Sequence, residues 1–163
     1  MANPERVVVN ASPLIILFKS LQADLLPQLF QEIVLPQAVL KEVVAAGTGD
    51  MAAQQVPITP WLTLVAESGV DPRVAAWDLG AGESAVLSYA LSSPGYCAMV
   101  DDRAARRCAK SLGIPVLGAG GMLVLAKRRG LIPSVEPGLE GIRTAGLWLS
   151  DEVIALLKKQ AGE

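Results

Sequence analysis

Apolar and polar residues along the chain form two kinds of segment, short apolar runs and longer amphipathic stretches. The short runs are rich in Val, Ile and Leu, and each is followed by a polar residue, a proline or a glycine. Runs of this kind are typical of buried β-strands. They predict strands at Arg6–Val9, Glu32–Leu35, Tyr96–Val100 and Ile114–Leu117, with Trp61–Val65 as a candidate edge strand.

The amphipathic stretches predict helices. Ser12 followed by Pro13 predicts the start of the first helix, with Ser12 as its N-cap. Ser150 is expected to cap the last helix, which is amphipathic. The apolar face of that last helix is formed by Val153, Leu156 and Leu157. We expect the helices at Leu14–Phe18, Ala23–Phe30, Gln37–Ala46, Asp71–Trp77, Arg103–Leu112, Met122–Arg129, Pro133–Ala145 and Asp151–Gln160, with a further one that begins near Leu79.

Strands and helices alternate along the whole chain except in Thr48–Ala76, which contains several prolines and is expected to be a variable excursion. This alternation predicts an α/β domain with a mostly parallel sheet, helices on both faces and right-handed crossovers. We expect a single domain over residues 1–163, with the C-terminal helical segment 133–160 packed on it.

The composition of the chain excludes some kinds of catalytic and metal-binding side chain. The 163 residues are 52 % hydrophobic and only 18 % charged, as in globular proteins. The sequence contains no histidine, which excludes imidazole as base, nucleophile or metal ligand. Cys97 and Cys108 lack metal-binding spacing and are expected to be unpaired core residues in a reducing compartment. We expect a cytoplasmic protein, because neither a signal peptide nor an apolar run of about 20 residues is evident.

The charge of the chain also limits its partners. A net charge of −2 argues against a strong attraction of the whole protein to nucleic acid. Contact with nucleic acid would have to come from local basic clusters, although such runs are more often solvated helix faces. The clusters are Arg103, Arg106, Arg107 and Lys110, and Lys127, Arg128 and Arg129.

Polar side chains stand at the ends of the predicted elements. Asn10 ends the first strand, and Asp101 and Asp102 end a later one, so they meet at one rim if these parallel strands are neighbours. Glu42 and Glu83 lie on helices that could close over this rim. Oxygen ligands without nitrogen or sulfur favour Mg²⁺ or Mn²⁺. Such a site suits phosphate-ester hydrolysis, in which the metal polarises a phosphoryl oxygen and activates water.

Each of these residues also has a purely structural interpretation. Glu83 in a first helical turn interacts favourably with the helix dipole, and Asp102 can be an N-cap. Asn10 can shape a strand-to-helix turn, and Glu42 can be a solvated surface residue. The joint pattern is more informative than any one of its members.

Four motifs in a fixed order resemble the PIN-domain nucleases. The motifs are VVVNASPLI, VLPQAVLKEV, LGAGESAVLSYA, and AMVDDRAARRCAKSLGI together with VLGAGGMLVLAKRRGLI. The resemblance is closest to a prokaryotic branch described as predicted nucleic-acid-binding proteins, covers about Arg6 to Gly130, and is weakest at Thr48–Ala76. It implies a three-layer α/β/α sandwich with an acidic Mg²⁺ or Mn²⁺ site. It also implies an endoribonuclease that cleaves single-stranded RNA, often as the toxin of a toxin–antitoxin pair.

The resemblance carries over to individual residues. Asn10 falls where the family usually has its first Asp, Glu42 matches the helix Glu, and Glu83 the third acid. Asp102 matches the fourth acid, with Asp101 beside it. The implied catalytic residues are Asn10, Glu42, Glu83, Asp101 and Asp102, and the implied metal ligands are Asn10, Glu83, Asp101 and Asp102. Ser12 matches the small hydroxyl residue of the first motif, and the expected substrate-binding residues are Ser12, Arg103 and Arg106.

The partners that we expect are single-stranded RNA, a cognate antitoxin protein and a second copy of the chain in a homodimer. We expect no membrane partner.

Asn10 is the departure from the family pattern. An amide offers one oxygen to a metal but no charge, so metal affinity should be lower than with Asp. Because Asp is nearly isosteric with Asn, Asn10→Asp should leave the fold almost unchanged and tighten metal binding. One alternative is a non-catalytic PIN-like module that binds RNA or a protein. Another is a nucleotide-binding α/β protein, suggested by LGAGES and LGAGGM, although neither run has the Lys-Ser/Thr of a phosphate-binding loop.

Overall fold

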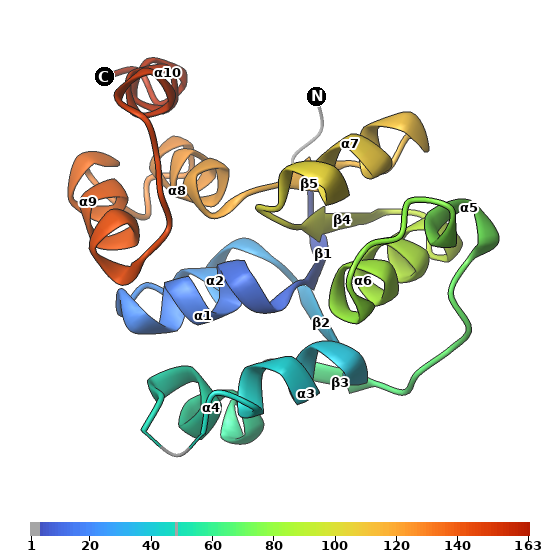
Figure 1. Ribbon diagram of the computed structural model, residues 1–163. Helices are drawn as coiled ribbons and strands as arrows, with labels where there is room; N and C mark the ends of the chain where they lie inside the picture. The colour runs from blue at the N-terminus through green and yellow to red at the C-terminus, as the bar shows by residue number, and fades with distance from the viewer. Residues whose placement is uncertain (1–3, 48) are drawn as a thin grey trace.

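The computed structural model describes residues 4–47 and 49–163, and its strands form one parallel sheet. The strands are β1 (Arg6–Val9), β2 (Glu32–Pro36), β3 (Thr63–Val65), β4 (Tyr96–Met99) and β5 (Val116–Leu117). Their order is β3-β2-β1-β4-β5, and every neighbouring pair is parallel (Figure 1). The predicted parallel sheet is therefore confirmed, with β3 at its edge.

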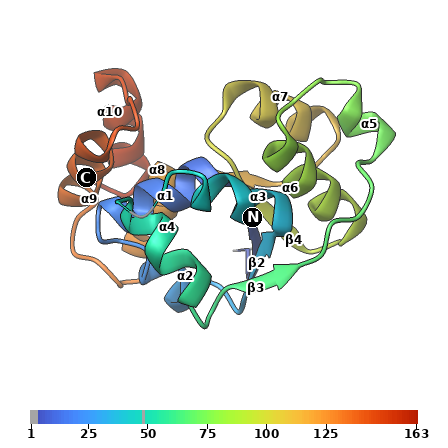
Figure 2. The same ribbon diagram turned by 60° about the horizontal axis from the view of Figure 1, so that its bottom comes forward.

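Helices cover both faces of this sheet. They are α1 (Ala11–Lys19), α2 (Leu25–Leu29), α3 (Gln37–Val44), α4 (Met51–Gln55), α5 (Pro72–Ala75), α6 (Ala81–Ser92), α7 (Arg103–Ser111), α8 (Ala119–Arg128), α9 (Glu136–Ala145) and α10 (Asp151–Gln160), with a 3₁₀ turn η1 at Val56–Ile58. Figure 1 and Figure 2 show α1, α2, α8 and α9 on one side of the sheet and α5, α6 and α7 on the other. The predicted three-layer α/β/α sandwich is confirmed.

The central strand β1 lies at the middle of the hydrophobic core. Val7, Val8 and Val9 are all fully buried, because helices cover both of their faces. Burying one such side chain contributes about 1.5–3 kcal/mol of hydrophobic free energy. A strand that is buried on both faces has a continuous apolar sequence, which explains why β1 and β4 could be predicted closely.

The predicted start of the first helix is wrong. α1 begins at Ala11, so its N-cap is Asn10 and not Ser12. Pro13 is the third helical residue rather than the first. The helix therefore starts directly at the end of β1, and Asn10 belongs to both the strand end and the helix start.

The predicted start of α8 at Met122 is also wrong, since the helix begins three residues earlier, at Ala119. Glycine disfavours helix, so Gly120 and Gly121 predict a later start, but in the folded chain packing places both glycines within the helix. A Cβ atom on Gly120 would lie 2.7 Å from Cδ1 of Leu157, so α10 comes close to the α8 backbone at this point. This contact between distant segments cannot be read from the local sequence.

The expected excursion Thr48–Ala76 contains two elements that were not predicted, α4 and η1. Asp50 caps α4, because its Oδ1 accepts the N–H of Ala53 at 3.1 Å. Thr48, the first residue of the expected excursion, lies outside the described residues, as do residues 1–3 of the expected domain.

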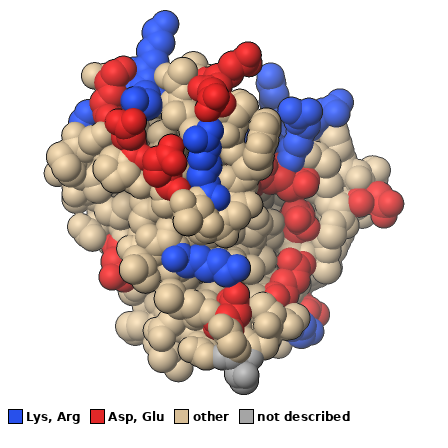
Figure 3. Space-filling model, turned by 60° about the vertical axis from the view of Figure 1, so that its left-hand side comes forward, with Lys and Arg blue, Asp and Glu red and all other residues tan. Residues whose placement is uncertain are grey.

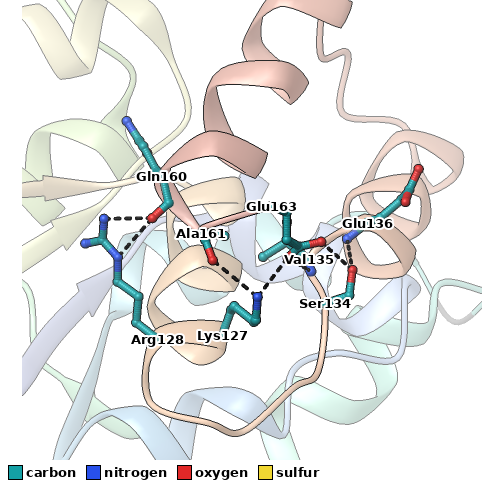
Figure 4. A network of polar contacts seen from close by, with 8 residues as sticks. All are labelled: Lys127, Arg128, Ser134, Val135, Glu136, Gln160, Ala161 and Glu163. Carbon is teal, nitrogen blue, oxygen red and sulfur yellow. Dashed lines mark hydrogen bonds and ion pairs between the residues drawn. The ribbon is translucent and has the colours of Figure 1, made fainter.

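The C-terminal helix α10 is attached through polar contacts at its end and through Ile154 and Leu157, which pack against the core. The predicted cap is confirmed, because Oγ of Ser150 accepts the N–H of Val153 at 3.1 Å. Of its predicted apolar face, Val153 and Leu156 remain 41 % and 53 % exposed. Figure 4 shows what holds the end of the helix: Lys127 and Arg128 of α8 donate to the carbonyls of Ala161 and Gln160, while the carboxylate of Glu163 accepts from Ser134 and Val135.

Two further expectations concern the environment of the chain. Cys97 and Cys108 are buried and unpaired, as predicted. Over the described ranges, we find no helix with both the length and the apolar character needed to cross a membrane.

Candidate functional site

Asn10 lies at the carboxyl end of the central strand. Its backbone N–H continues the sheet pairing by donating to the carbonyl of Met99 at 3.0 Å. The residue is only 1 % exposed, and its side-chain Oδ1 is the one buried side-chain oxygen or nitrogen without a hydrogen-bond partner among the described residues. An unpaired buried acceptor costs about 1–3 kcal/mol, so its retention requires a reason, such as an ion or water that it binds.

Asp101 lies two residues beyond β4, the strand that neighbours β1. Its carboxylate accepts the N–H of Ala119, the first residue of α8, at 3.2 Å from Oδ1. Burial raises the pKa of Asp101, and the Ala119 N–H and the positive charge of Arg106 only partly offset this. A Cβ on Gly118 would lie 2.6 Å from Oδ1 of Asp101, so this carboxylate is held against the start of α8.

Asp102 is placed differently from its neighbour. It is exposed, and its Oδ2 accepts the N–H of Ala105 at 2.9 Å, which makes it the N-cap of α7. The structural interpretation of Asp102 is thus confirmed, whereas its role as a metal ligand stays a prediction. Of the two consecutive aspartates, Asp102 bonds to α7, the helix that follows it, whereas Asp101 bonds to the first residue of α8.

Glu42 and Glu83 each place a carboxylate at the first turn of α6. The N–H of Gly82 donates to Oε1 of Glu42 at 2.9 Å, across the contact between α3 and α6. The carboxylate of Glu83 folds back over the helix start, because a Cβ on Gly80 would lie 2.5 Å from its Oε2. Two carboxylates therefore flank one helix N-terminus, where the helix dipole favours negative charge.

The three predicted substrate-binding residues follow Asn10 and Asp102 closely in the sequence, and two of them are exposed. Ser12 is the second residue of α1, and Arg103 the first of α7; both are exposed. Arg106 is half-buried, and its Nη1 donates to the carbonyl of Val100 at 3.1 Å. Arg106 therefore supports the loop that carries Asp101.

These residues can be tested against a divalent cation. Among the residues that the structure describes, no group of three His, Cys, Asp or Glu side chains could hold a metal ion. Mg²⁺, however, is commonly bound by one or two carboxylates, with water completing its coordination. Asn10 and Asp101 follow the neighbouring strands β1 and β4, and the unpartnered oxygen of Asn10 and the carboxylate of Asp101 are the kind of donors that such a sparse, all-oxygen site uses.

One face of the domain carries acidic and basic side chains without a single dominant sign (Figure 3). On the face shown in Figure 3, acidic and basic side chains are interspersed, in keeping with the net charge of −2. A nucleic acid at this face would depend on local contacts rather than on a long-range field.

Comparison with known families decides the relationship. A family model described as a PIN domain matches residues 6–163, which is almost the whole chain. The chain belongs to the PIN-domain family. The PIN domain is a nuclease-type fold, and its members are generally dependent on divalent metals. The comparison with curated proteins gives no match.

Three glycines that the sequence did not single out shape this PIN-domain site. Gly80, Gly82 and Gly118 each lie where a Cβ would approach a carboxylate oxygen to 2.6 Å or less. Gly80 and Gly118 are the N-cap residues of α6 and α8, and Gly82 is the second residue of α6. The glycine-rich strings LGAGES and LGAGGM were the available signal, but they suggested nucleotide phosphate rather than the protein's own carboxylates.

Proposed function

We propose that the protein is a metal-dependent ribonuclease of PIN type that cleaves single-stranded RNA, with a site weakened by Asn10 in place of Asp. The observation that carries the proposal is the buried, unpartnered oxygen of Asn10 at the carboxyl edge of a PIN-domain sheet. In parallel α/β sheets ligands bind at this edge.

The residues that would hold Mg²⁺ or Mn²⁺ are Asn10, Asp101 and Glu83, with Asp102 as the fourth predicted ligand. Such an ion polarises a phosphoryl oxygen and lowers the pKa of a water molecule. The chain itself fixes the position of Asp101 through the Ala119 N–H. Arg103 is exposed beside this loop and can bind an RNA phosphate.

The test is Mn²⁺-dependent cleavage of a labelled single-stranded RNA, with Asp101→Asn as the variant. Asn keeps an oxygen that can accept the Ala119 N–H, so the fold should survive. We expect a loss of cleavage of about 100-fold or more, because a metal contributes several kcal/mol of transition-state stabilisation.

Asp24→Asn is the matched control for this variant. It makes the same chemical change at an exposed residue whose side chain forms no capping bond with α2. Cleavage that persists in a chelator, or that is equal in both variants, would contradict the proposal.

One observation favours the second candidate, a non-catalytic PIN-like module that binds RNA or a protein. Glu42, Asp101 and Asp102 each accept a backbone N–H in the first turn of a helix, so their charges already have structural partners. RNA binding that is independent of Mn²⁺ and is followed by no cleavage would support this candidate. The toxin role, the antitoxin partner and the homodimer stay predictions that follow from the family resemblance.

A further inference from the structure

Among the described residues, three helices are capped in the same way. In each, a side-chain oxygen accepts the backbone N–H three residues further along, at 2.9–3.1 Å, while the cap residue itself has extended backbone angles. The pairs are Asp50 with Ala53, Asp102 with Ala105, and Ser150 with Val153. A cap of this type stabilises a helix by about 1 kcal/mol.

Asn10 has the backbone of such a cap but not the bond. Its angles, φ −88° and ψ 164°, match those of the capped helices, and Asn is among the best capping residues. Three residues further along stands Pro13, which has no N–H to donate. The side chain makes no capping bond, and its Oδ1 stays buried and unpartnered.

The neighbouring N–H does not replace the missing donor. Asp71, which caps α5, accepts from Arg73, two residues further along, at 2.9 Å. The equivalent donor for Asn10 is the N–H of Ser12, and the structure shows no side-chain bond to it. The amide oxygen of Asn10 is therefore not engaged by its own helix.

We propose that Pro13 is a positioning residue that keeps the oxygen of Asn10 available for a divalent cation. With an N–H at position 13, the oxygen would be drawn into an ordinary N-cap, and a cation would have to compete with that bond. This inference rests on the proposed metal-dependent function, and it assigns a reason to the unpaired oxygen.

The experiment is Pro13→Ala, which supplies the missing N–H. Mn²⁺ binding, measured by calorimetry, should weaken about fivefold, the factor equivalent to a capping bond of about 1 kcal/mol. Pro13 is buried, so its removal also loses packing. The same substitution is therefore made in an Asn10→Ala background, where no cap can form and Mn²⁺ affinity should not change further.

The metal-free protein provides a second readout. The effect of Pro13→Ala on the melting temperature is measured both with Asn10 present and in the Asn10→Ala background. With Asn10 present the effect should be more favourable by about 2–4 °C, because only there can the new cap form. By amide hydrogen exchange, the new N–H at position 13 should be protected without metal and should lose protection at saturating Mn²⁺. This exchange measurement does not depend on the stability of the double variant.

Pro137→Ala is the control for losing a proline from a first helical turn, since Val135, the N-cap of α9, provides no side-chain acceptor. It should leave Mn²⁺ affinity unchanged. If Pro13→Ala binds Mn²⁺ as tightly as the wild type, or if its new N–H at position 13 is unprotected without metal, the inference is overturned while the proposed function stands. If the wild type itself binds no Mn²⁺, the proposed function fails and the inference fails with it.

Discussion

Asn10 directly follows β1, is the N-cap of α1, and carries the oxygen that is proposed to bind the metal ion. Its burial changes what a carboxylate at this position would do. A charged group at a position that is only 1 % exposed is destabilising without a partner, because desolvation is not repaid. The expectation that Asn10→Asp leaves the fold almost unchanged therefore applies only when a cation is present.

Asn10→Asp should lower the melting temperature of the metal-free protein and raise its Mn²⁺ affinity about tenfold. At saturating Mn²⁺, a tenfold gain in affinity is equivalent to about 1.4 kcal/mol of added stability. The measurement is a paired thermal melt of wild type and variant with and without Mn²⁺. Equal affinity in both proteins would show that position 10 is not a ligand and would favour the non-catalytic module.

At the scale of elements, the site is assembled from helix starts that follow parallel strands. At three helix starts a carboxylate accepts a backbone N–H. Glu42 does so at α6 and Asp101 at α8, whereas at α7 the acceptor is Asp102, the N-cap of that helix. Glycines make room for two of them. In the first turn of α6, Gly82 is buried, and a Cβ atom there would meet the carboxylate of Glu42.

Gly82→Ala should destabilise the protein, although Ala favours helix over Gly by about 0.5–1 kcal/mol. The new Cβ would lie 2.6 Å from Oε1 of Glu42 and would displace its hydrogen bond, which is worth about 1.5–3 kcal/mol for a charged group. The melting temperature should fall by about 2–4 °C. Gly141→Ala in α9 is the control, because its Cβ would lie 3.2 Å from the nearest atom, Nε2 of Gln22, and not 2.6 Å; equal effects would show that the Glu42 contact is unimportant.

The elements that could be predicted from the sequence are those whose own residues determine them. β1, β4 and α10 have continuous or periodic apolar patterns with clear ends, and their predicted limits hold to within a residue. The start of α8 could not be predicted, because it depends on Leu157 lying over Gly120. The cap of α1 was misplaced because Ser-Pro is a strong local signal, whereas Asn10 becomes the cap only through continuity with β1.

At the scale of the whole molecule, α10 is an appendage to the sandwich. None of its own residues is buried, and its end is held by hydrogen bonds to α8 and to the loop before α9 (Figure 4). The apolar contacts between the core strands do not depend on pH, whereas the polar contacts that hold this helix include ionisable groups. Acidification should therefore release α10 before it opens the sheet.

Glu163 determines the pH at which this release occurs. Hydrogen bonds from Ser134 and Val135, together with Lys127, hold the pKa of Glu163 below its usual 4.5. Because the folded state lowers this pKa, the stabilisation is complete above pH 4.5 and is lost as the pH falls through the lowered value. Amide protection in α10, measured relative to the intrinsic exchange rate at each pH, should thus fall as the pH drops below 4.5 while β1 stays protected, and Glu163→Gln should lower it already at about pH 7.

Glu152→Gln is the control, since it removes an exposed charge from the first turn of the same helix, away from this network. It should leave exchange at the C-terminal end of α10 unchanged. If α10 and the sheet exchanged together at every pH, the polar contacts of Glu163 would not be what holds the helix. The attachment would then rest on Leu157 against α8, the apolar contact that remains when Glu163 is protonated.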